Sequence, residues 1–511
     1  MTSRPRRFAV GVAAMGVALA LTYAAGLVLG AVPYPPAALQ DLLVRIAPGN
    51  LATGAIEHLG HWAMRLLAIG LHLGVLLAGG WIAAALAGET SFARKARAGL
   101  AVTAALFLAS VALGLTGGGM SLPAFIVYAI AAYGFGRVAS GVPFGRALEP
   151  EVRQGETPLD AMHRSRRRFV SRTLAAGGLI VLAAGGALRL VFKRPPRVAI
   201  AGAGRPFVPP PGDPAFPDVA GLSPEITPNA DFYNVDIDFL KPSVDASSWR
   251  LAVGGLVDAP YELNFRQLQT GFEVVEMAHT LTCISNEVGG NLISTAVWRG
   301  VRLKDVLARA GLRPGVAELV FKSAEGYSDS IPLAKANEDT TLVVFGMNGV
   351  ALPREHGFPA RIIVPGIYGM KNVKWLTGIT AVDHHYRGYW EVRGWDDVAR
   401  VKTESRFDVP APASTVHLPA SLAGVAWAGD RRVAAVEVSD DGGQTWRRAV
   451  LKRELSPVAW RLWAADVTPE AGLRRVMVRA ADGTGAVQSA QLANPHPDGA
   501  SGYDVLTFQV Q

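Results

Sequence analysis

Long apolar stretches with almost no charge dominate the first 192 residues of this 511-residue chain. A helix needs about 20 residues to cross the hydrocarbon core of a bilayer. Five stretches approach or exceed that length: Phe8–Val32, Leu66–Gly88, Ala98–Gly117, Gly117–Gly136 and Thr173–Phe192. Because helices buried in a large soluble protein are shorter and carry more charge, we predict all-α transmembrane helices here. Four would form a membrane domain over residues 1–160, and a fifth would lie within residues 161–193.

The positions of the arginines predict how these helices are oriented. The stretch 137–172 holds eight arginines, whereas 33–65 holds only Arg45 and Arg65. Positively charged short loops stay in the cytoplasm. We therefore predict a multi-pass protein of the inner (cytoplasmic) membrane that contacts membrane lipid. Its N-terminus would be cytoplasmic and everything after the fifth helix extracytoplasmic. The formal net charge of +8 does not form a basic stripe interleaved with aromatic residues, so we predict no nucleic-acid partner.

A run of arginines precedes the fifth apolar stretch. Ser165-Arg-Arg-Arg-Phe-Val-Ser171, followed by a weakly apolar segment rich in Gly and Ala, resembles a twin-arginine export signal. An ordinary positively charged cluster at the cytoplasmic side is the alternative. The twin-arginine pathway carries folded proteins, usually with a cofactor already bound. No small-residue cleavage site is convincing, so the fifth helix is expected to remain as an anchor.

Histidines near the membrane segments raise the question of a haem b. His58, His61 and His72 are the candidates, and segments one, three, four and five contain no histidine that could serve as a second ligand. An ionisable residue inside a membrane suggests a function by default. A packing or hydrogen-bonding role is nevertheless favoured over haem ligation.

The second half of the chain has the composition of globular domains. Residues 194–228 are rich in Pro and Gly and predict an extended linker. Residues 229–408 combine apolar strand patterns, such as Leu251–Leu256 and Glu318–Lys322, with a helix at Leu303–Ala310 that ends at Gly311, which predicts an α+β domain. In residues 409–511 alternating strands flank turns such as Asp440–Gly443, which predicts an all-β immunoglobulin-like sandwich.

Cys283 is the only cysteine, so an intramolecular disulfide is excluded. It lies in His279-Thr-Leu-Thr-Cys-Ile-Ser-Asn286-Glu-Val-Gly-Gly290, which has the appearance of a metal-ligand loop. A buried, inert cysteine is the alternative that a lone thiol most often represents.

Residues 226–511 resemble the sulfite oxidase family of molybdopterin enzymes. The most specific match is His356-Gly-Phe-Pro-Ala-Arg361-Ile-Ile-Val-Pro-Gly-Ile-Tyr368-Gly-Met-Lys371-Asn372-Val-Lys374-Trp-Leu, and Cys283-Ile-Ser-Asn286 fits the family's cysteine loop. The resemblance implies a molybdopterin domain at 229–408 and a dimerisation-type immunoglobulin-like domain at 409–511. It also implies oxygen-atom transfer at a molybdenum held by one molybdopterin. The residues it implies at the site are Cys283 as metal ligand and catalytic centre, with Tyr233, Asn234, His356, Arg361, Asn372 and Lys374 binding the cofactor.

The cysteine loop departs from the family pattern in a way that bears on the substrate. Family members continue with Gly-Asn-Arg-Arg after one residue, whereas this chain has Ser285, Asn286, Glu287 and Val288. A carboxylate in place of a cation repels an anion such as sulfite. We therefore expect a small neutral or sulfur-containing substrate. Tyr368, Tyr386, Trp390 and Arg393 are further candidates to line the pocket.

Three functional readings remain after this comparison. The favoured one is a membrane-anchored, extracytoplasmic molybdenum enzyme that exchanges electrons with a respiratory partner or the quinone pool and forms a homodimer through its C-terminal domain. A non-catalytic binding or assembly module with the same fold is the alternative. A transporter with an appended domain is disfavoured, since the apolar helices show neither repeated halves nor an internal acidic residue.

Overall fold

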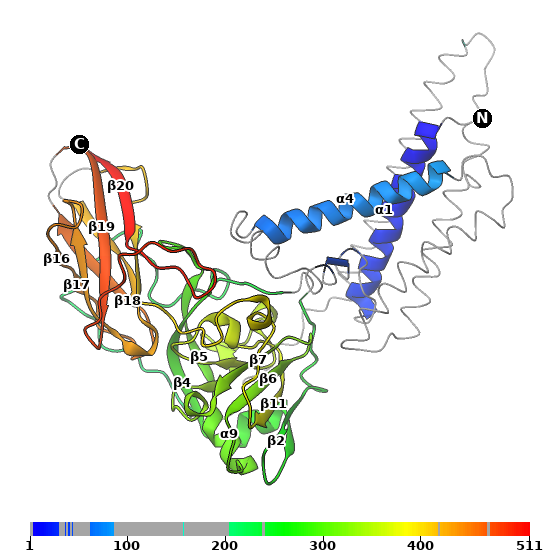
Figure 1. Cartoon of the computed structure of the whole chain (residues 1–511), viewed down its shortest axis with the longest axis horizontal. Helices are drawn as coiled ribbons and strands as arrows, with labels where there is room; N and C mark the ends of the chain where they lie inside the picture. Colours follow the sequence, from blue (N-terminus) through cyan, green and yellow to red (C-terminus); the bar gives the residue numbers. More distant parts are fainter. Residues whose placement is uncertain are drawn as a thin grey trace. The chain divides into compact units, whose positions relative to one another are not determined.

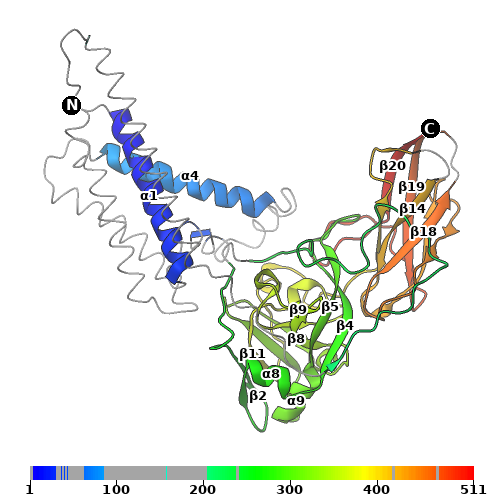
Figure 2. The same ribbon diagram turned by 180° about the vertical axis from the view of Figure 1, so that it is seen from behind.

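A computed structural model describes residues 4–29, 36, 39–40, 43, 62–85, 157, 204–237, 241–416, 420–467 and 471–511. The chain divides into two compact units, shown from opposite sides in Figures 1 and 2. In the first unit, helix α1 (Arg4–Leu29) packs against helix α4 (Trp62–Ala85). Met15 and Leu19 of α1 meet Val75 and Leu76 of α4 in a small apolar cluster.

The helices α1 and α4 cover the first two predicted membrane segments. Among the described residues, no helix has both the length and the hydropathy that crossing a membrane requires. The prediction of membrane spans at Phe8–Val32 and Leu66–Gly88 is therefore not confirmed. The other three segments, the Ser165–Ser171 run, His58 and His61 all lie outside the described residues. His72 lies in α4, and its Nδ1 donates to the carbonyl oxygen of Ala68 at 2.7 Å, which is the hydrogen-bonding role favoured above.

The second unit begins with an α+β region built on two sheets. The first sheet has the order β1-β4-β5-β8-β10, and the short strand β9 also pairs with β8, outside this order. Its strands are β1 (Gly204–Arg205), β4 (Val274–Thr282), β5 (Ile293–Arg302), β8 (Leu342–Met347), β9 (Val350–Ala351) and β10 (Arg361–Ile363). Every residue of β8 is buried, as expected for a central strand that is covered on both faces.

The second sheet of this region has the order β3-β2-β11-β6-β7. Its strands are β2 (Arg250–Gly255), β3 (Tyr261–Asn264), β6 (Glu318–Ser323), β7 (Ser328–Pro332) and β11 (Leu376–Val382). The helices are α8 (Phe265–Thr270), α9 (Leu303–Ala310) and α10 (Leu333–Ala336), with single 3-10 turns η2 (Arg354–His356), η3 (Gly369–Lys371) and η4 (Glu391–Arg393). Helix α9 confirms the predicted bounds and ends because Gly311 adopts φ +69°, a left-handed conformation that glycine accepts without strain.

The C-terminal region is a sandwich of two β sheets, as predicted. The sheets have the orders β12-β14-β18-β17 and β13-β20-β19-β15-β16, and Figure 2 shows β14 beside β18. The strands are β12 (Glu404–Val409), β13 (Thr415–Val416), β14 (Ala420–Trp427), β15 (Val433–Ser439), β16 (Arg447–Arg448), β17 (Val450–Leu451), β18 (Arg461–Val467), β19 (Gly472–Asp482) and β20 (Asp504–Val510), with a 3-10 turn η5 (Gly429–Arg431) after β14. Trp463 and Phe508 are fully buried between the sheets. Because β12 already pairs with β14, the β sandwich starts at Glu404.

Candidate active site

Cys283 directly follows strand β4, at the point where the chain turns toward β5. Its side chain is buried, and Sγ lies 3.0 Å from Oγ of Ser285. Burial raises the pKa of the thiol, while the hydrogen bond with Ser285 and the positive charge of Lys374 act in the opposite direction. Burial is the largest of these effects, so the thiol keeps its proton in this structure, and Lys374 is the cation that favours the thiolate.

The loop between Cys283 and β5 is closed by its own hydrogen bonds. The amide of Cys283 donates to the carbonyl oxygen of Leu292 at 2.9 Å, and the amide of Asn286 donates to the carbonyl oxygen of Cys283 at 3.0 Å. Oδ1 of Asn286 also accepts from the amide of Leu292 at 2.8 Å. The cysteine therefore sits on a short, internally tied loop.

Tyr233 lies near this loop, and its predicted contact with a cofactor stays a prediction. Its amide donates to Oγ of Ser294 at 3.1 Å, and its hydroxyl oxygen would lie only 2.6 Å from a Cβ added at Gly369. Burial raises the pKa of Tyr233 well above its usual value, and the nearby thiol of Cys283 raises it further. The tyrosine therefore remains an O–H donor in the neighbourhood of the sulfur.

The guanidinium of Arg361 is almost completely enclosed. It donates to the carbonyl oxygens of His356 at 3.3 Å and Asn372 at 2.9 Å, and it lies 5.3 Å from the ring of Trp298. Burial lowers the pKa of Arg361 to about 10, so it stays charged at neutral pH. Its Nε has no partner among the described residues, which leaves a buried donor available for an acceptor.

Lys374 is a second cation of the site. Its Nζ donates to Oδ1 of Asp236 at 2.6 Å, to Oδ1 of Asn234 at 2.9 Å and to the carbonyl oxygen of Glu355 at 3.1 Å. Burial lowers the pKa of Lys374 to about 8, although Asp236 opposes the shift. Asn234 is therefore brought to the site, but as a partner of the lysine.

His356 and Asn372 differ in whether a polar side-chain atom lacks a hydrogen-bond partner among the described residues. His356 Nε2 donates to the carbonyl oxygen of Asn229 at 3.0 Å, and its buried Nδ1 has no partner within the described residues. Burial lowers the pKa of His356 to about 4, so the ring is neutral. Asn372 instead uses both ends of its amide locally: Oδ1 accepts from Val364 at 2.6 Å and Nδ2 donates to the carbonyl oxygen of Tyr368 at 3.1 Å. Contact between Asn372 and a cofactor stays a prediction.

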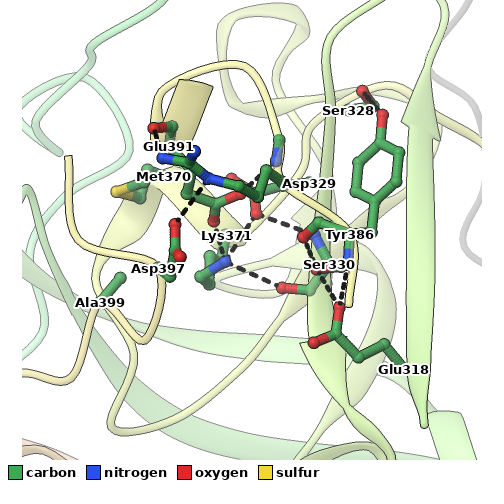
Figure 3. Close-up of polar contacts among 12 residues, drawn as sticks. Glu318, Ser328, Asp329, Ser330, Met370, Lys371, Tyr386, Glu391, Asp397 and Ala399 are labelled. Carbon is green, nitrogen blue, oxygen red and sulfur yellow. Dashed lines mark hydrogen bonds and ion pairs between the residues drawn. The ribbon is translucent and has the colours of Figure 1, made fainter. Parts of the chain in front are cut away.

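A buried charge network underlies the same segment and was not predicted. Lys371 Nζ donates to Oδ1 of Asp329 at 2.8 Å and to the Glu391 carboxylate, and Figure 3 shows the ammonium group among these partners and Ser330. Burial raises the pKa of Asp329 to about 7; the ammonium group of Lys371 opposes the shift, and the second carboxylate of Glu391 adds to it. Lys371 stands in the same motif run as Arg361 and Lys374, so the sequence showed a third cation there but not its buried carboxylate partners.

The carboxylate that contacts the cysteine loop is not the one that the sequence indicated. Glu287 is exposed, whereas Glu404 Oε2 accepts from Nδ2 of Asn286 at 3.1 Å. Burial raises the pKa of Glu404 to about 7, and the hydrogen bond from Asn286 counteracts the shift. Glu404 is therefore a second carboxylate of the loop region, in addition to the exposed Glu287.

Two of the other candidates for lining the pocket contact residues outside the cysteine loop. Tyr386 exchanges a 2.6 Å hydrogen bond with Ser328, and Trp390 packs edge-on against Trp395. Tyr368 is buried, and the charges of Glu404 and Cys283 both add to the effect of burial in raising its pKa. Of these, Tyr368 is the one whose electrostatics tie it to the cysteine.

Comparison with protein families supports the assignment of this region. Residues 239–390 match the oxidoreductase molybdopterin binding domain, and residues 397–494 match the Mo-co oxidoreductase dimerisation domain.

Similar proteins of known function share this part of the chain. Sulfite oxidase of Gallus gallus is 31% identical over 320 residues, which cover 52% of this chain and 69% of that protein. Mitochondrial sulfite oxidase of Rattus norvegicus is 33% identical over 318 residues, covering 52% and 58%. Nitrate reductase [NAD(P)H] of Hordeum vulgare is 31% identical over 305 residues, covering 47% and 34%. The chain thus spans little more than half of the rat enzyme and about a third of the barley enzyme.

A solved structure shows a similar fold. The sulfane dehydrogenase SoxCD from Paracoccus pantotrophus matches with a TM-score of 0.50 and 24% identity, over 56% of this chain and 82% of that one. At this identity the likeness concerns the fold alone.

The described residues fit a molybdenum–molybdopterin cofactor. Among them, no group of three or more His, Cys, Asp or Glu side chains could hold a metal ion. Cys283 supplies the soft thiolate that suits such a metal. Arg361 and Lys374 supply cations, and the unpartnered buried Nε of Arg361 and Nδ1 of His356 are polar atoms that a bound pterin or phosphate would satisfy.

Proposed function

The chain belongs to the sulfite oxidase family of molybdopterin oxidoreductases, and on that premise we propose that it catalyses oxygen-atom transfer on a small sulfur-containing or neutral oxide substrate. The observation that carries the proposal is the buried thiol of Cys283, tied into a short loop beside Tyr233 and within the field of Lys374. When bound, the molybdenum cofactor supplies the two-electron redox chemistry. The protein's part is to hold the cofactor and orient the substrate.

The chain's residues have distinct tasks in this proposal. Cys283 acts as the metal ligand and must lose its proton to bind, which Ser285 and Lys374 favour. Arg361 and Lys374 anchor the anionic end of the cofactor. Tyr233 stays protonated and donates a hydrogen bond near the sulfur.

The charges around the loop support an uncharged substrate. The arginines expected after the cysteine are replaced by Glu287 and Val288. The carboxylate of Glu404, which accepts from Asn286, adds negative character when it is ionised. An anion such as sulfite is therefore disfavoured electrostatically.

Metal analysis and a substrate screen test the function together. We expect about one molybdenum per chain in the purified full-length protein, because a single thiolate holds one metal. The protein should turn over a sulfoxide or another neutral sulfur compound, with artificial electron donors or acceptors, faster than sulfite. Absence of molybdenum after growth with ample molybdate would support the non-catalytic module instead.

The charge argument has its own variant. Glu287→Arg restores a cation in the cysteine loop, and we expect a rise in kcat/KM for sulfite of about fivefold, the effect of about 1 kcal/mol between partly solvated charges. No gain would leave the substrate preference without its electrostatic basis.

The location and partners of the enzyme rest on the sequence. The arginine distribution and the Ser165–Ser171 run support an extracytoplasmic active site reached by twin-arginine export, with anchoring by apolar segments outside the described residues. Fractionation of cells with and without a functional twin-arginine pathway tests this.

The match to a dimerisation domain supports a homodimer, which light scattering of the purified protein measures. Exchange of electrons with a respiratory partner or the quinone pool is proposed on the same footing.

A further inference from the structure

The cysteine loop is held from outside by the C-terminal β sandwich. NH1 of Arg406, on β12, donates to the carbonyl oxygen of Gly290 at 2.8 Å. Gly289, at φ +73°, lies against Asp504 so closely that an added Cβ would be 2.6 Å from Oδ1 of that residue. Asp504 in turn accepts from the amide of Phe407 on β12 at 2.9 Å. These contacts secure the end of the loop that leads into β5.

A further contact with the cysteine loop comes from Glu404, the first residue of β12. Glu404 is 118 residues from Asn286 in sequence, yet its Oε2 accepts the Asn286 side-chain N–H at 3.1 Å. Glu404 therefore contacts the loop close to Cys283 in sequence.

Hydrogen bonds of Asn286 connect Glu404 with the backbone of Cys283. The side chain of Asn286 is buried. Its Oδ1 accepts from the backbone amide of Leu292, and its backbone amide donates to the carbonyl oxygen of Cys283. With Oδ1 committed inside the loop, the side-chain N–H group points to Glu404. Rotation of this amide would break the hydrogen bonds at both of its ends, since oxygen and nitrogen would exchange places. Glu404 thus selects the orientation of Asn286 that closes the loop.

Burying the Glu404 carboxylate costs free energy that an exposed carboxylate would not cost. In the described part of the chain Glu404 makes no ion pair, and Arg406, two residues later, is paired with Asp408 at 3.0 Å instead. A partly buried carboxylate without a cation destabilises a protein unless hydrogen bonds compensate. Its compensation here comes from the cysteine loop.

We infer that Glu404 is a positioning residue for the metal-ligand loop: by hydrogen bonding Asn286, the C-terminal domain sets the place of the Cys283 sulfur. The inference rests on the proposed function in taking Cys283 as the metal ligand. It gives the C-terminal domain a role in the active site of its own chain, in addition to the role in dimerisation that the family match indicates.

Four variants of the full-length protein test this inference. Glu404→Ala removes the acceptor, whereas Glu404→Gln keeps an oxygen that Asn286 can donate to. Asn286→Ala removes the intermediary, and the double variant Glu404→Ala/Asn286→Ala completes a double-mutant cycle. Glu437→Ala is the matched control, since Glu437 is a partly buried glutamate of β15 in the same sandwich that pairs with Arg479.

Thiol reactivity gives a readout that does not need the metal. Because Cys283 is the only cysteine, maleimide labels one defined atom in protein made by a host that lacks molybdopterin. We expect Glu404→Ala and Asn286→Ala to raise the labelling rate several-fold and to the same extent, with no further rise in the double variant. Glu404→Gln and Glu437→Ala should label at the wild-type rate.

The molybdenum-loaded proteins give the second readout. We expect kcat per bound molybdenum to fall about 10- to 100-fold in Glu404→Ala, the effect of a small displacement of a reacting group. The electron paramagnetic resonance spectrum of the reduced metal should change with it, and Glu404→Gln should restore both. Wild-type labelling rate, kcat and spectrum in a folded Glu404→Ala protein would overturn the inference. Absence of molybdenum from the wild type would instead overturn the proposed function.

Discussion

The Nζ atom of Lys371 lies 2.8 Å from Oδ1 of Asp329, and both side chains are excluded from solvent. Glu391 is a second buried carboxylate on the same ammonium group, so two acids share one base. Tyr327 completes the group, because its one hydroxyl hydrogen can be donated either to Oδ2 of Asp329 at 3.1 Å or to the carbonyl oxygen of Met370 at 2.8 Å. The network thus connects β7, the turn that precedes Asn372, and the 388–394 segment.

Replacing the lysine is expected to destabilise the fold strongly. Lys371→Met leaves Asp329 and Glu391 buried without a cation, and breaking a buried pair in this way costs about 3–5 kcal/mol. Urea unfolding followed by circular dichroism measures the change. The matched control is Lys304→Met, which removes a largely exposed ion pair with Asp339 and should cost less than about 1 kcal/mol. Equal effects of the two substitutions would contradict the account.

Substituting the metal ligand should separate folding from cofactor binding. We expect Cys283→Ser to lose nearly all molybdenum and activity, because a neutral hydroxyl is a poor ligand for a soft metal site. The substitution is close to isosteric, so the melting temperature of the cofactor-free protein should stay within a few degrees of the wild type. Molybdenum retained at the wild-type level would show that another group holds the metal.

We expect that lysine cannot replace Arg361 in binding the cofactor. Arg361→Lys keeps the charge but cannot reach the carbonyl oxygens of His356 and Asn372 at the same time, and it removes the unpartnered Nε. We expect the content of bound molybdopterin, measured by fluorescence of its oxidised form, to fall at least tenfold, which corresponds to about 1.4 kcal/mol of binding free energy. Arg354→Lys, at a more exposed position where Nε donates to the carbonyl oxygen of Pro242, is the control and should bind normally.

The stability of the protein in acid should depend on His279. This histidine is fully buried, and both ring nitrogens lack partners among the described residues. Burial lowers its pKa to about 3, and the charge of Lys335 contributes. Below the unfolded-state pKa of about 6.5 the unfolded chain binds a proton that the folded protein does not. The free energy of unfolding therefore falls as the pH drops from about 6.5 toward 3, and is insensitive to this group at higher pH.

His279→Phe removes the titrating group and isolates its effect. The difference in unfolding free energy between wild type and variant should be constant above pH 7 and shift toward the variant between pH 6.5 and 4. A difference that does not vary with pH would show that the histidine is protonated in the folded state or hydrated within it.

Several elements of the fold were predictable from local pattern alone. Helix α9 follows from apolar periodicity with Gly311 at its end, and β15 follows from alternation that stops at the Asp440–Gly443 turn. These signals are local, because helix ends and hairpin turns depend on the conformational preferences of neighbouring residues. The predicted membrane spans did not follow in the same way, since apolar content over α1 and α4 did not produce a described helix that meets the requirements for crossing a bilayer.

Sequence determines that one thiol is available and that Arg361, Lys374 and His356 share a motif run with a molybdopterin family. Tertiary structure decides which charge stands beside that thiol. Glu287 is adjacent to the loop in sequence but turns to solvent, while Glu404 arrives from 118 residues away by the pairing of β12 with β14. Hydrogen bonding and burial act at distances of a few ångströms in space, whereas sequence patterns report only neighbours along the chain, so the partner of Asn286 had no local signal.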